Sequence, residues 1–248
     1  MRDSENQKVS DERRRGRPRG RTAQGAETRR RLYDVAIGLI ASRGYEATTL
    51  RDVAREAGVS VGLLYRYFPS KRAVVLALYD DLSAKYASQA VQMPAGRWSD
   101  RFFHALRASL EVLGPHRNTL AALIPVLVGD AREGLFARGA AFSRFRVQKV
   151  FAEAVIGALD APQPGLAEAM GRLLYLVHLA VILWWLLDKS PAQRATEALL
   201  RALERAAPMA VLTLRLRGIR TFIVAADAAF REALFDDRAA QGPAEPPG

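Results

Sequence analysis

Hydrophobic residues along this chain recur at helical spacing, and few stretches alternate as a strand would. In residues 27–43, for example, the apolar positions follow the i, i+3, i+4, i+7, i+8 pattern of one buried helix face. Glycine and proline mark the boundaries between such segments. The pattern predicts an all-α fold with helices at about 27–43, 50–58, 61–68, 71–92, 98–113, 118–130, 139–159, 165–188, 191–206 and 209–235.

Composition divides the chain into a basic arm, two helical domains and a tail. Residues 1–25 are polar and rich in Arg and Gly, which predicts a disordered arm. Residues 26–76 carry the first helices, and the fourth helix is expected to continue to about residue 92 as a connector. A larger helical domain is expected over residues 97–236, followed by a disordered tail at 237–248.

The segment 49-TLRDVAREAGVSVGLLYRYF-68 has the pattern of a helix-turn-helix. Two short helices meet there at a tight turn that contains a glycine. Thr49 is a good N-cap for the first, and Asp52 three residues later predicts a weak capping box. Gly58 stands where the chain needs a positive φ or a close turn. The second helix of such a motif enters the major groove of DNA.

These residues resemble the N-terminal domain of the TetR/AcrR family of bacterial transcriptional regulators. The resemblance covers about residues 27–76. It rests on Gly44-Tyr45, Thr48-Thr49, Ala54, Ala57-Gly58-Val59-Ser60, Gly62, Leu64-Tyr65, Tyr67-Phe68 and Ser70-Lys71. It implies a three-helix DNA-binding domain followed by a larger helical domain that binds ligand and dimerises. The C-terminal part adds only helical periodicity and a suitable length.

The resemblance also implies roles in DNA binding for individual residues. Thr49 and Tyr65 would donate hydrogen bonds to phosphates, and Lys71 would contact another phosphate. Arg51 would reach a phosphate or a base edge. Phosphate contacts fix orientation, whereas base contacts fix sequence. A structural role remains open for two of these residues, with Thr49 serving only as a cap and Tyr65 only as an aromatic at the edge of the core.

The second helix of the motif departs from the common family pattern, because Val61 and Leu63 stand where polar residues are frequent. Facing the groove, they would contact thymine methyl groups, and Arg66 would read guanine through O6 and N7. The candidate DNA contacts in this domain are Thr49, Arg51, Ser60, Val61, Gly62, Leu63, Tyr65, Arg66 and Lys71.

The arm contains the run 13-RRRGRPRGR-21, and its core 15-RGRPRG-20 resembles an AT-hook. Arg15, Arg17 and Arg19 would then lie in a narrow minor groove, where negative potential is concentrated. The alternative is a generic basic tail that adds only salt-sensitive, non-specific affinity. Both interpretations stay open.

The net charge of +11 favours a polyanionic partner, although liberal use of Arg by a GC-rich genome would give the same balance. Cysteine is absent, which excludes disulfides and Cys-ligated zinc. The N-terminus lacks the apolar segment of a secretory signal. The longest uncharged apolar run, 173–187, is shorter than the ~20 residues of a membrane span. We therefore expect a cytoplasmic protein without a membrane partner.

No enzymatic motif is evident. The histidines at 104, 116 and 178 lack metal-binding spacing, and neither GxSxG nor HExxH occurs. We expect no catalytic residue, metal or cofactor. The pocket for an effector, expected to be an apolar or aromatic small molecule, has weak candidates: Phe102, Phe103, Phe142, Phe145, Tyr175 and His178. The alternative for each is an ordinary core residue.

Helix 165–188 is apolar around most of its circumference and needs cover on all sides. We expect it to form a homodimer interface with helix 191–206, the alternative being the core helix of a monomer. The sequence thus predicts a dimeric regulator, most simply a repressor released from a palindromic operator by its effector. The alternative is an architectural, nucleoid-type DNA-binding protein without an effector.

Overall fold

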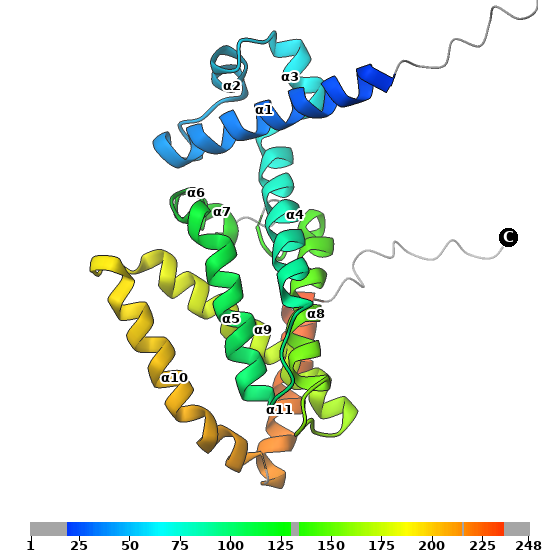
Figure 1. Ribbon diagram of the computed structural model, residues 1–248, viewed down its shortest axis with the longest axis vertical. Coiled ribbons are helices and arrows are strands. Elements are labelled where there is room, and N and C mark those ends of the chain that lie inside the picture. The colour runs from blue at the N-terminus through cyan, green and yellow to red at the C-terminus, as the bar shows by residue number, and fades with distance from the viewer. Residues whose placement is uncertain (1–18, 130–133, 215, 236–248) are drawn as a thin grey trace, which may run out of the picture. The chain divides into compact units, whose positions relative to one another are not determined.

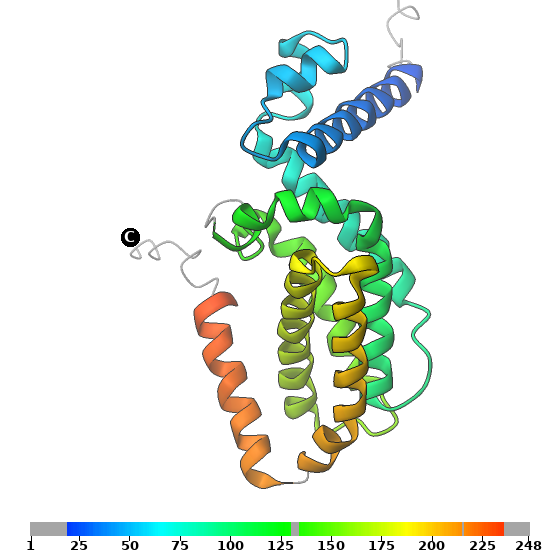
Figure 2. The same ribbon diagram turned by 90° about the vertical axis from the view of Figure 1, so that its left-hand side faces the viewer.

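The computed structural model describes residues 19–129, 134–214 and 216–235, and every regular element among them is helical. The chain divides into two compact units, one ending at Val74 and the other beginning at Val75. Figures 1 and 2 trace the helices of both units. The all-α prediction is confirmed.

The N-terminal unit contains α1 (Arg19–Arg43), α2 (Leu50–Glu56), α3 (Val61–Tyr67) and the start of α4 (Lys71–Ala90). Its core joins residues from each of these helices with the chain that follows α3. The largest fully buried side chains are Leu32, Ile40, Val53, Leu64, Phe68 and Val74. Gly44 and Gly58 have φ of +86° and +62°, a conformation that glycine adopts without strain. These two turns set the directions of α2 and α3.

The C-terminal unit contains the rest of α4 and the helices α5 (Trp98–Leu113), α6 (Arg117–Ala122), α7 (Ile124–Gly129), α8 (Ala141–Ile156), α9 (Pro164–Leu187), α10 (Arg194–Thr213) and α11 (Arg217–Phe230). Short turns of other helix types cover Gly114–His116, Arg138–Ala140, Pro191–Gln193 and Arg231–Phe235. Helix α9 lies centrally and packs against α5, α6, α8, α10 and α11. Figure 2 shows it beside α10, to which it is joined by a tight connection.

Helices α8 and α9 approach each other closely at Gly171. A Cβ at Gly171 would lie 2.7 Å from Cα of Ala152, so only glycine lets the two backbones meet here. Arg101 fixes the same end of α8 by donating to the carbonyls of Pro94, Glu153 and Ala154. Helix α9 is also long and apolar enough to cross a membrane by length and composition, a test that core helices of soluble proteins also pass.

Three predicted boundaries are wrong. Residues 19–25 were expected in the disordered arm but begin α1. Residues 19–25 contain no proline, so nothing in them blocks a helix. Extending an existing helix costs little free energy, so the helix that is packed at Leu32 continues back through Gly25 and Gly20. The segment 118–130 is two helices, because Pro125 cannot donate to a carbonyl one turn earlier. Conversely, α10 continues through Pro208 to Thr213, where the flanking alanines favour helix.

Candidate DNA interface and ligand cavity

The N-terminus of α2 is held by a reciprocal cap, as predicted. The hydroxyl of Thr49 accepts from the Asp52 backbone N–H at 3.1 Å. The Asp52 carboxylate accepts from the Thr49 backbone at 3.1 Å and from its hydroxyl at 2.6 Å. These bonds, with the Thr49 hydroxyl contributing most, lower the pKa of Asp52 below its ordinary value. The exposed Thr49 hydroxyl therefore already has an acceptor, and donating to a phosphate would mean exchanging Asp52 for it.

Helix α3 presents one exposed face. Val61 and Tyr65 lie one turn apart with 37% and 47% of their surface exposed, and Gly62 and Arg66 form the neighbouring exposed row. Leu64, on the opposite side, is fully buried. Leu63 is half-buried between the two faces. Four of the five predicted α3 contacts therefore share the solvent face.

The remaining predicted contacts flank this face. Ser60 caps α3 by accepting from the Leu63 backbone N–H at 3.2 Å. Arg51 is exposed, and neither it nor Arg66 forms a hydrogen bond or ion pair with another described residue. Both guanidiniums are therefore available to an acceptor beyond the described residues.

Lys71 has a structural role that the sequence did not reveal. Its ammonium donates to the carbonyl of Tyr45 at 2.8 Å and lies 4.2 Å from the centre of the Tyr45 ring. It thus ties the start of α4 to the turn after α1, with two N–H donors left for a phosphate. Of the arm residues, Arg19 is the first residue of α1, whereas Arg15 and Arg17 lie outside the described residues.

A partly open cavity of about 120 Å³ lies in the C-terminal unit, among α4, α5, α6, α7, α8 and α9. Its lining is apolar apart from tyrosines, serines and one histidine, and it includes no charged residue. The lining residues are Tyr79, Leu82, Ser83, Tyr86, Ser109, Leu113, Leu120, Leu127, Ser143, Val147, Tyr175, His178, Leu179, Ile182 and Leu186.

The polar groups of this cavity are neutral. His178 Nε2 lies 2.8 Å from the hydroxyl of Ser109, and burial lowers the pKa of His178 to about 3. Burial raises the pKa of Tyr86 far above its ordinary value. Tyr86 stacks on the His178 ring at 6.3 Å between centroids, and Phe151 contacts both rings. The wall is therefore aromatic, uncharged and weakly polar.

Of the six residues proposed for an effector pocket, Tyr175 and His178 line this cavity. Phe102 is buried behind it against Phe151, and Phe103 borders a different hollow beside α10. The prediction that Phe142 and Phe145 line the pocket is wrong. They are 68% and 64% exposed, because α8 turns Ser143, Val150 and Phe151 toward the core instead.

Sequence reasoning missed the contribution of α4. Leu82 and Tyr86 line the cavity, although this helix had been interpreted as a connector. The available signal was the apolar spacing of Leu78, Tyr79, Leu82 and Tyr86, which defines one buried helix face.

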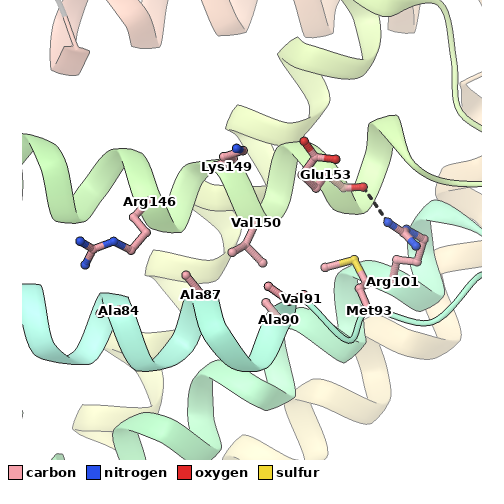
Figure 3. A pocket seen from close by; sticks show the side chains of 10 residues that line it. All are labelled: Ala84, Ala87, Ala90, Val91, Met93, Arg101, Arg146, Lys149, Val150 and Glu153. Atoms are coloured by element: carbon pink, nitrogen blue, oxygen red, sulfur yellow. Dashed lines mark hydrogen bonds between the residues drawn. The ribbon is translucent and has the colours of Figure 1, made fainter.

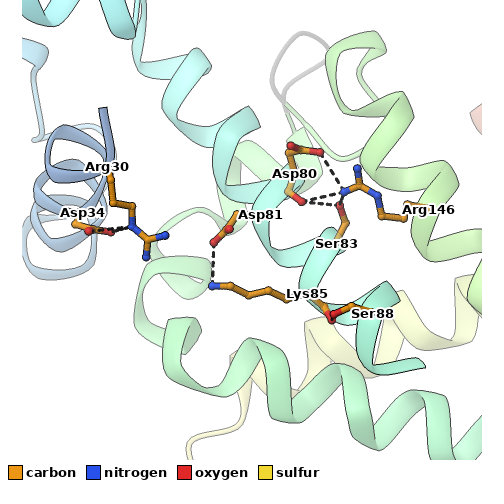
Figure 4. Close-up of polar contacts among 8 residues, drawn as sticks. All are labelled: Arg30, Asp34, Asp80, Asp81, Ser83, Lys85, Ser88 and Arg146. Atoms are coloured by element: carbon orange, nitrogen blue, oxygen red, sulfur yellow. Dashed lines mark hydrogen bonds and ion pairs between the residues drawn. The ribbon is translucent and has the colours of Figure 1, made fainter. Parts of the chain in front are cut away.

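A second hollow of about 600 Å³ lies between α4 and α8, and Figure 3 shows its lining. Its floor is apolar, from Ala84, Ala87 and Val150, and its rim carries Arg146, Lys149 and Glu153. Arg146 donates to the Asp80 carbonyl, the Asp80 carboxylate and the Ser83 hydroxyl, which ties α8 to α4 (Figure 4). No group of three or more metal-ligating side chains occurs within the described ranges.

Comparison with known proteins gives a family match in the N-terminal part of the chain. Residues 32–78 match the family described as bacterial regulatory proteins, tetR family. The HTH-type transcriptional repressor KstR of Rhodococcus jostii is 53% identical over 45 residues, which are 18% of this chain and 21% of that protein. The chain thus spans about a fifth of the length of this relative.

Solved structures extend the likeness of fold into the C-terminal unit. A tetR-family regulator from Streptomyces coelicolor matches 87% of this chain and 96% of its own, with 21% identity and a TM-score of 0.53. FadR of Bacillus subtilis in complex with stearoyl-CoA matches 70% of this chain and 96% of its own, with 15% identity and a TM-score of 0.55.

Proposed function

We propose that this chain, which belongs to the TetR family of bacterial regulatory proteins, is a sequence-specific transcriptional repressor released from a palindromic operator by a small molecule. The observation that carries the proposal is the exposed face of α3, which follows the capped helix α2 in a helix-turn-helix. That face lies within residues 32–78, which match the family described as bacterial regulatory proteins, tetR family. We assign DNA binding to residues 26–76 and effector binding and dimerisation to residues 97–236.

On this proposal, the DNA contacts fall into two groups. Lys71, Tyr65 and Thr49 donate to phosphates and orient the domain. Arg66 reads guanine in the major groove, and Val61 contacts a thymine methyl group beside it. Arg51, Ser60, Gly62 and Leu63 complete the interface at its edges. The arm, with Arg15, Arg17 and Arg19, adds affinity as a minor-groove hook or as a basic tail.

A homodimer fits the surface of α9. Although this helix is central to its unit, Val177, Leu183, Trp184 and Leu187 are 36–56% exposed. An apolar row on an otherwise packed helix calls for cover by a second copy. Two copies related by a two-fold axis, packing α9 and α10 against their counterparts, would place two α3 helices on the two halves of a palindrome.

The cavity supports an effector. Helix α4 begins with the DNA-facing Lys71 and lines the cavity with Leu82 and Tyr86, so it carries both sites. A ligand lowers DNA affinity only as far as it prefers a conformation that binds DNA poorly. The proposed protein is cytoplasmic, has no catalytic function and takes no membrane partner.

Footprinting on the DNA upstream of its own gene tests the proposal. A regulator protects a discrete palindrome, whereas an architectural protein, the alternative function, binds broadly with a steep salt dependence. Arg66→Ala should relax discrimination at one base pair by about 1–3 kcal/mol. Arg30→Ala is the matched control, because Arg30 pairs with Asp34 on α1 (Figure 4) and its loss should affect all sequences alike. Unchanged discrimination in Arg66→Ala would remove that residue from base readout.

The arm is tested separately by deleting residues 1–18, upstream of α1. Affinity should fall in either interpretation of the arm. A loss that depends on flanking A·T content indicates minor-groove recognition, whereas a uniform loss indicates a basic tail.

A further inference from the structure

Two buried polar groups line the cavity of about 120 Å³ without a hydrogen bond to any other described residue. The Tyr86 hydroxyl and His178 Nδ1 both lack a hydrogen-bond partner among the described residues. Tyr86 is 3% and His178 4% exposed, and both residues line the cavity. Buried polar groups are nearly always hydrogen-bonded, so an orphaned pair around one cavity calls for an explanation. A ligand that carries a hydrogen-bonding atom supplies one.

The charge of that ligand follows from the lining. All of the residues that surround the cavity are uncharged. Neither of the neighbouring guanidiniums lines the cavity: Arg144 donates to the carbonyls of Leu135 and Ala137, and Arg146 donates to Asp80 and Ser83. A carboxylate or ammonium group in the cavity would lose its hydration without gaining a counter-ion.

The hydrogen-bonding properties of the Tyr86 hydroxyl and His178 Nδ1 determine which polar atom of a ligand can bind them. The Tyr86 phenol stays protonated and donates to an oxygen acceptor. His178 uses Nε2 on the Ser109 hydroxyl, and the neutral ring leaves Nδ1 as either donor or acceptor according to its tautomer. A hydroxyl oxygen satisfies both groups in either tautomer, because it donates as well as accepts. A carbonyl oxygen, which only accepts, satisfies both groups when Nδ1 carries the proton. The rest of the wall is aliphatic or aromatic and suits an apolar body.

We infer that this cavity takes a neutral, mainly apolar molecule with one hydroxyl or carbonyl oxygen, and that Tyr86 and His178 recognise that oxygen. The inference rests on the proposed function and names the class of its effector. The volume of about 120 Å³ suits probes built on a single six-membered ring, since a cavity of about 150 Å³ elsewhere holds benzene.

Calorimetric titration of the full-length protein with three matched probes tests the inference. 4-Methylphenol should bind up to about tenfold tighter than toluene, which corresponds to the upper end of the net value of one hydrogen bond. 4-Methylbenzoate, of the same width but anionic, should not bind measurably. The inference is overturned if 4-methylbenzoate binds as tightly as 4-methylphenol or more tightly. It is also overturned if none of the three probes binds. This comparison uses only the unaltered protein and needs no variant to fold.

The variant Tyr86→Phe tests whether the Tyr86 hydroxyl binds the oxygen atom of the ligand. The variant should bind 4-methylphenol no better than toluene, with the affinity for toluene unchanged. Its melting temperature should not fall, because the deleted hydroxyl has no partner within the described protein. Ser88→Ala, an exposed position on the same helix, is the control and should keep the preference for 4-methylphenol. A Tyr86→Phe protein that also keeps this preference overturns the role of Tyr86.

A different experiment, DNA footprinting, tests the proposed function. That function fails when the ligand-free protein protects no discrete DNA site, which none of these titrations measures. A discrete footprint together with 4-methylbenzoate as the preferred probe would leave the repressor standing and remove only the neutral ligand.

Discussion

Gly171→Ala probes the contact between α8 and α9, two of the helices that line the cavity of about 120 Å³. The added methyl would lie 2.7 Å from Cα and 3.1 Å from the backbone nitrogen of Ala152. Carbon atoms in ordinary contact lie at about 3.5–4.0 Å. The obstructing atoms are backbone and cannot rotate away as a side chain could. The two helices would therefore have to separate by roughly 1 Å to restore that spacing.

The energetic consequence has two opposing parts. Inserting a methyl group into a close-packed contact costs about 1–3 kcal/mol, and the rigid backbone of Ala152 places this case near the upper end. Alanine returns about 1 kcal/mol over glycine in a helix interior. The net destabilisation is thus about 2 kcal/mol. For a domain of this size that lowers the melting temperature by about 4–8 °C.

Differential scanning calorimetry of the full chain measures this shift. Gly165→Ala is the matched control, since Gly165 lies in the same helix and a methyl there meets nothing within 4 Å. Its melting temperature should stay unchanged or rise slightly. A Gly171→Ala protein that melts at or above the wild type would refute the packing argument, and an equal fall in both variants would point to a general effect on α9.

Three further predictions concern caps and ion pairs. Thr49→Ala should destabilise the N-terminal unit by about 1 kcal/mol in urea unfolding, because α2 loses its reciprocal cap; an unchanged midpoint contradicts this. Asp227→Asn should cost about 2 kcal/mol and speed hydrogen exchange in α11, since it breaks the paired bonds from Arg172 at 2.6 and 2.8 Å. Asp188 caps α10, and its bonds, that from the Thr196 hydroxyl first, lower its pKa from 3.8. The folded state then holds its proton less tightly, so this stabilisation is present above pH 3.8 and is lost as pH falls toward the folded value. Asp188→Asn should be less stable than wild type at neutral pH, and the gap should close in acid; a constant gap contradicts the linkage.

The helix-turn-helix could be predicted closely because its signals are local. The Thr49 and Ser60 caps and the glycine at position 58 each act within one turn of chain, and α2 and α3 begin directly after their caps. The α3 face could be placed for the same reason, since burial of Leu64 alone fixes which residues face outward.

The cavity could not be predicted in the same way, because its lining comes from helices far apart in sequence. Phe142 and Phe145 have the residue type of a pocket wall yet face solvent, and nothing local to α8 distinguishes them from Phe151. Tyr86 became part of the wall only through packing of α4 against α8 and α9. Pro208 likewise has the local signal of a helix end, which the surrounding helix overrides.

Val61 gives the exposed α3 face a chemical consequence beyond its shape. An isopropyl group recognises a base through a methyl group and not through hydrogen-bond donors or acceptors. On the proposed function, this part of operator recognition would therefore depend on one carbon atom of thymine. Deoxyuridine pairs as thymidine does but lacks that carbon, and 5-methylcytosine presents a methyl group at the equivalent ring position. Operator recognition by this protein should therefore respond to the methylation state of its DNA at positions where base pairing is unchanged.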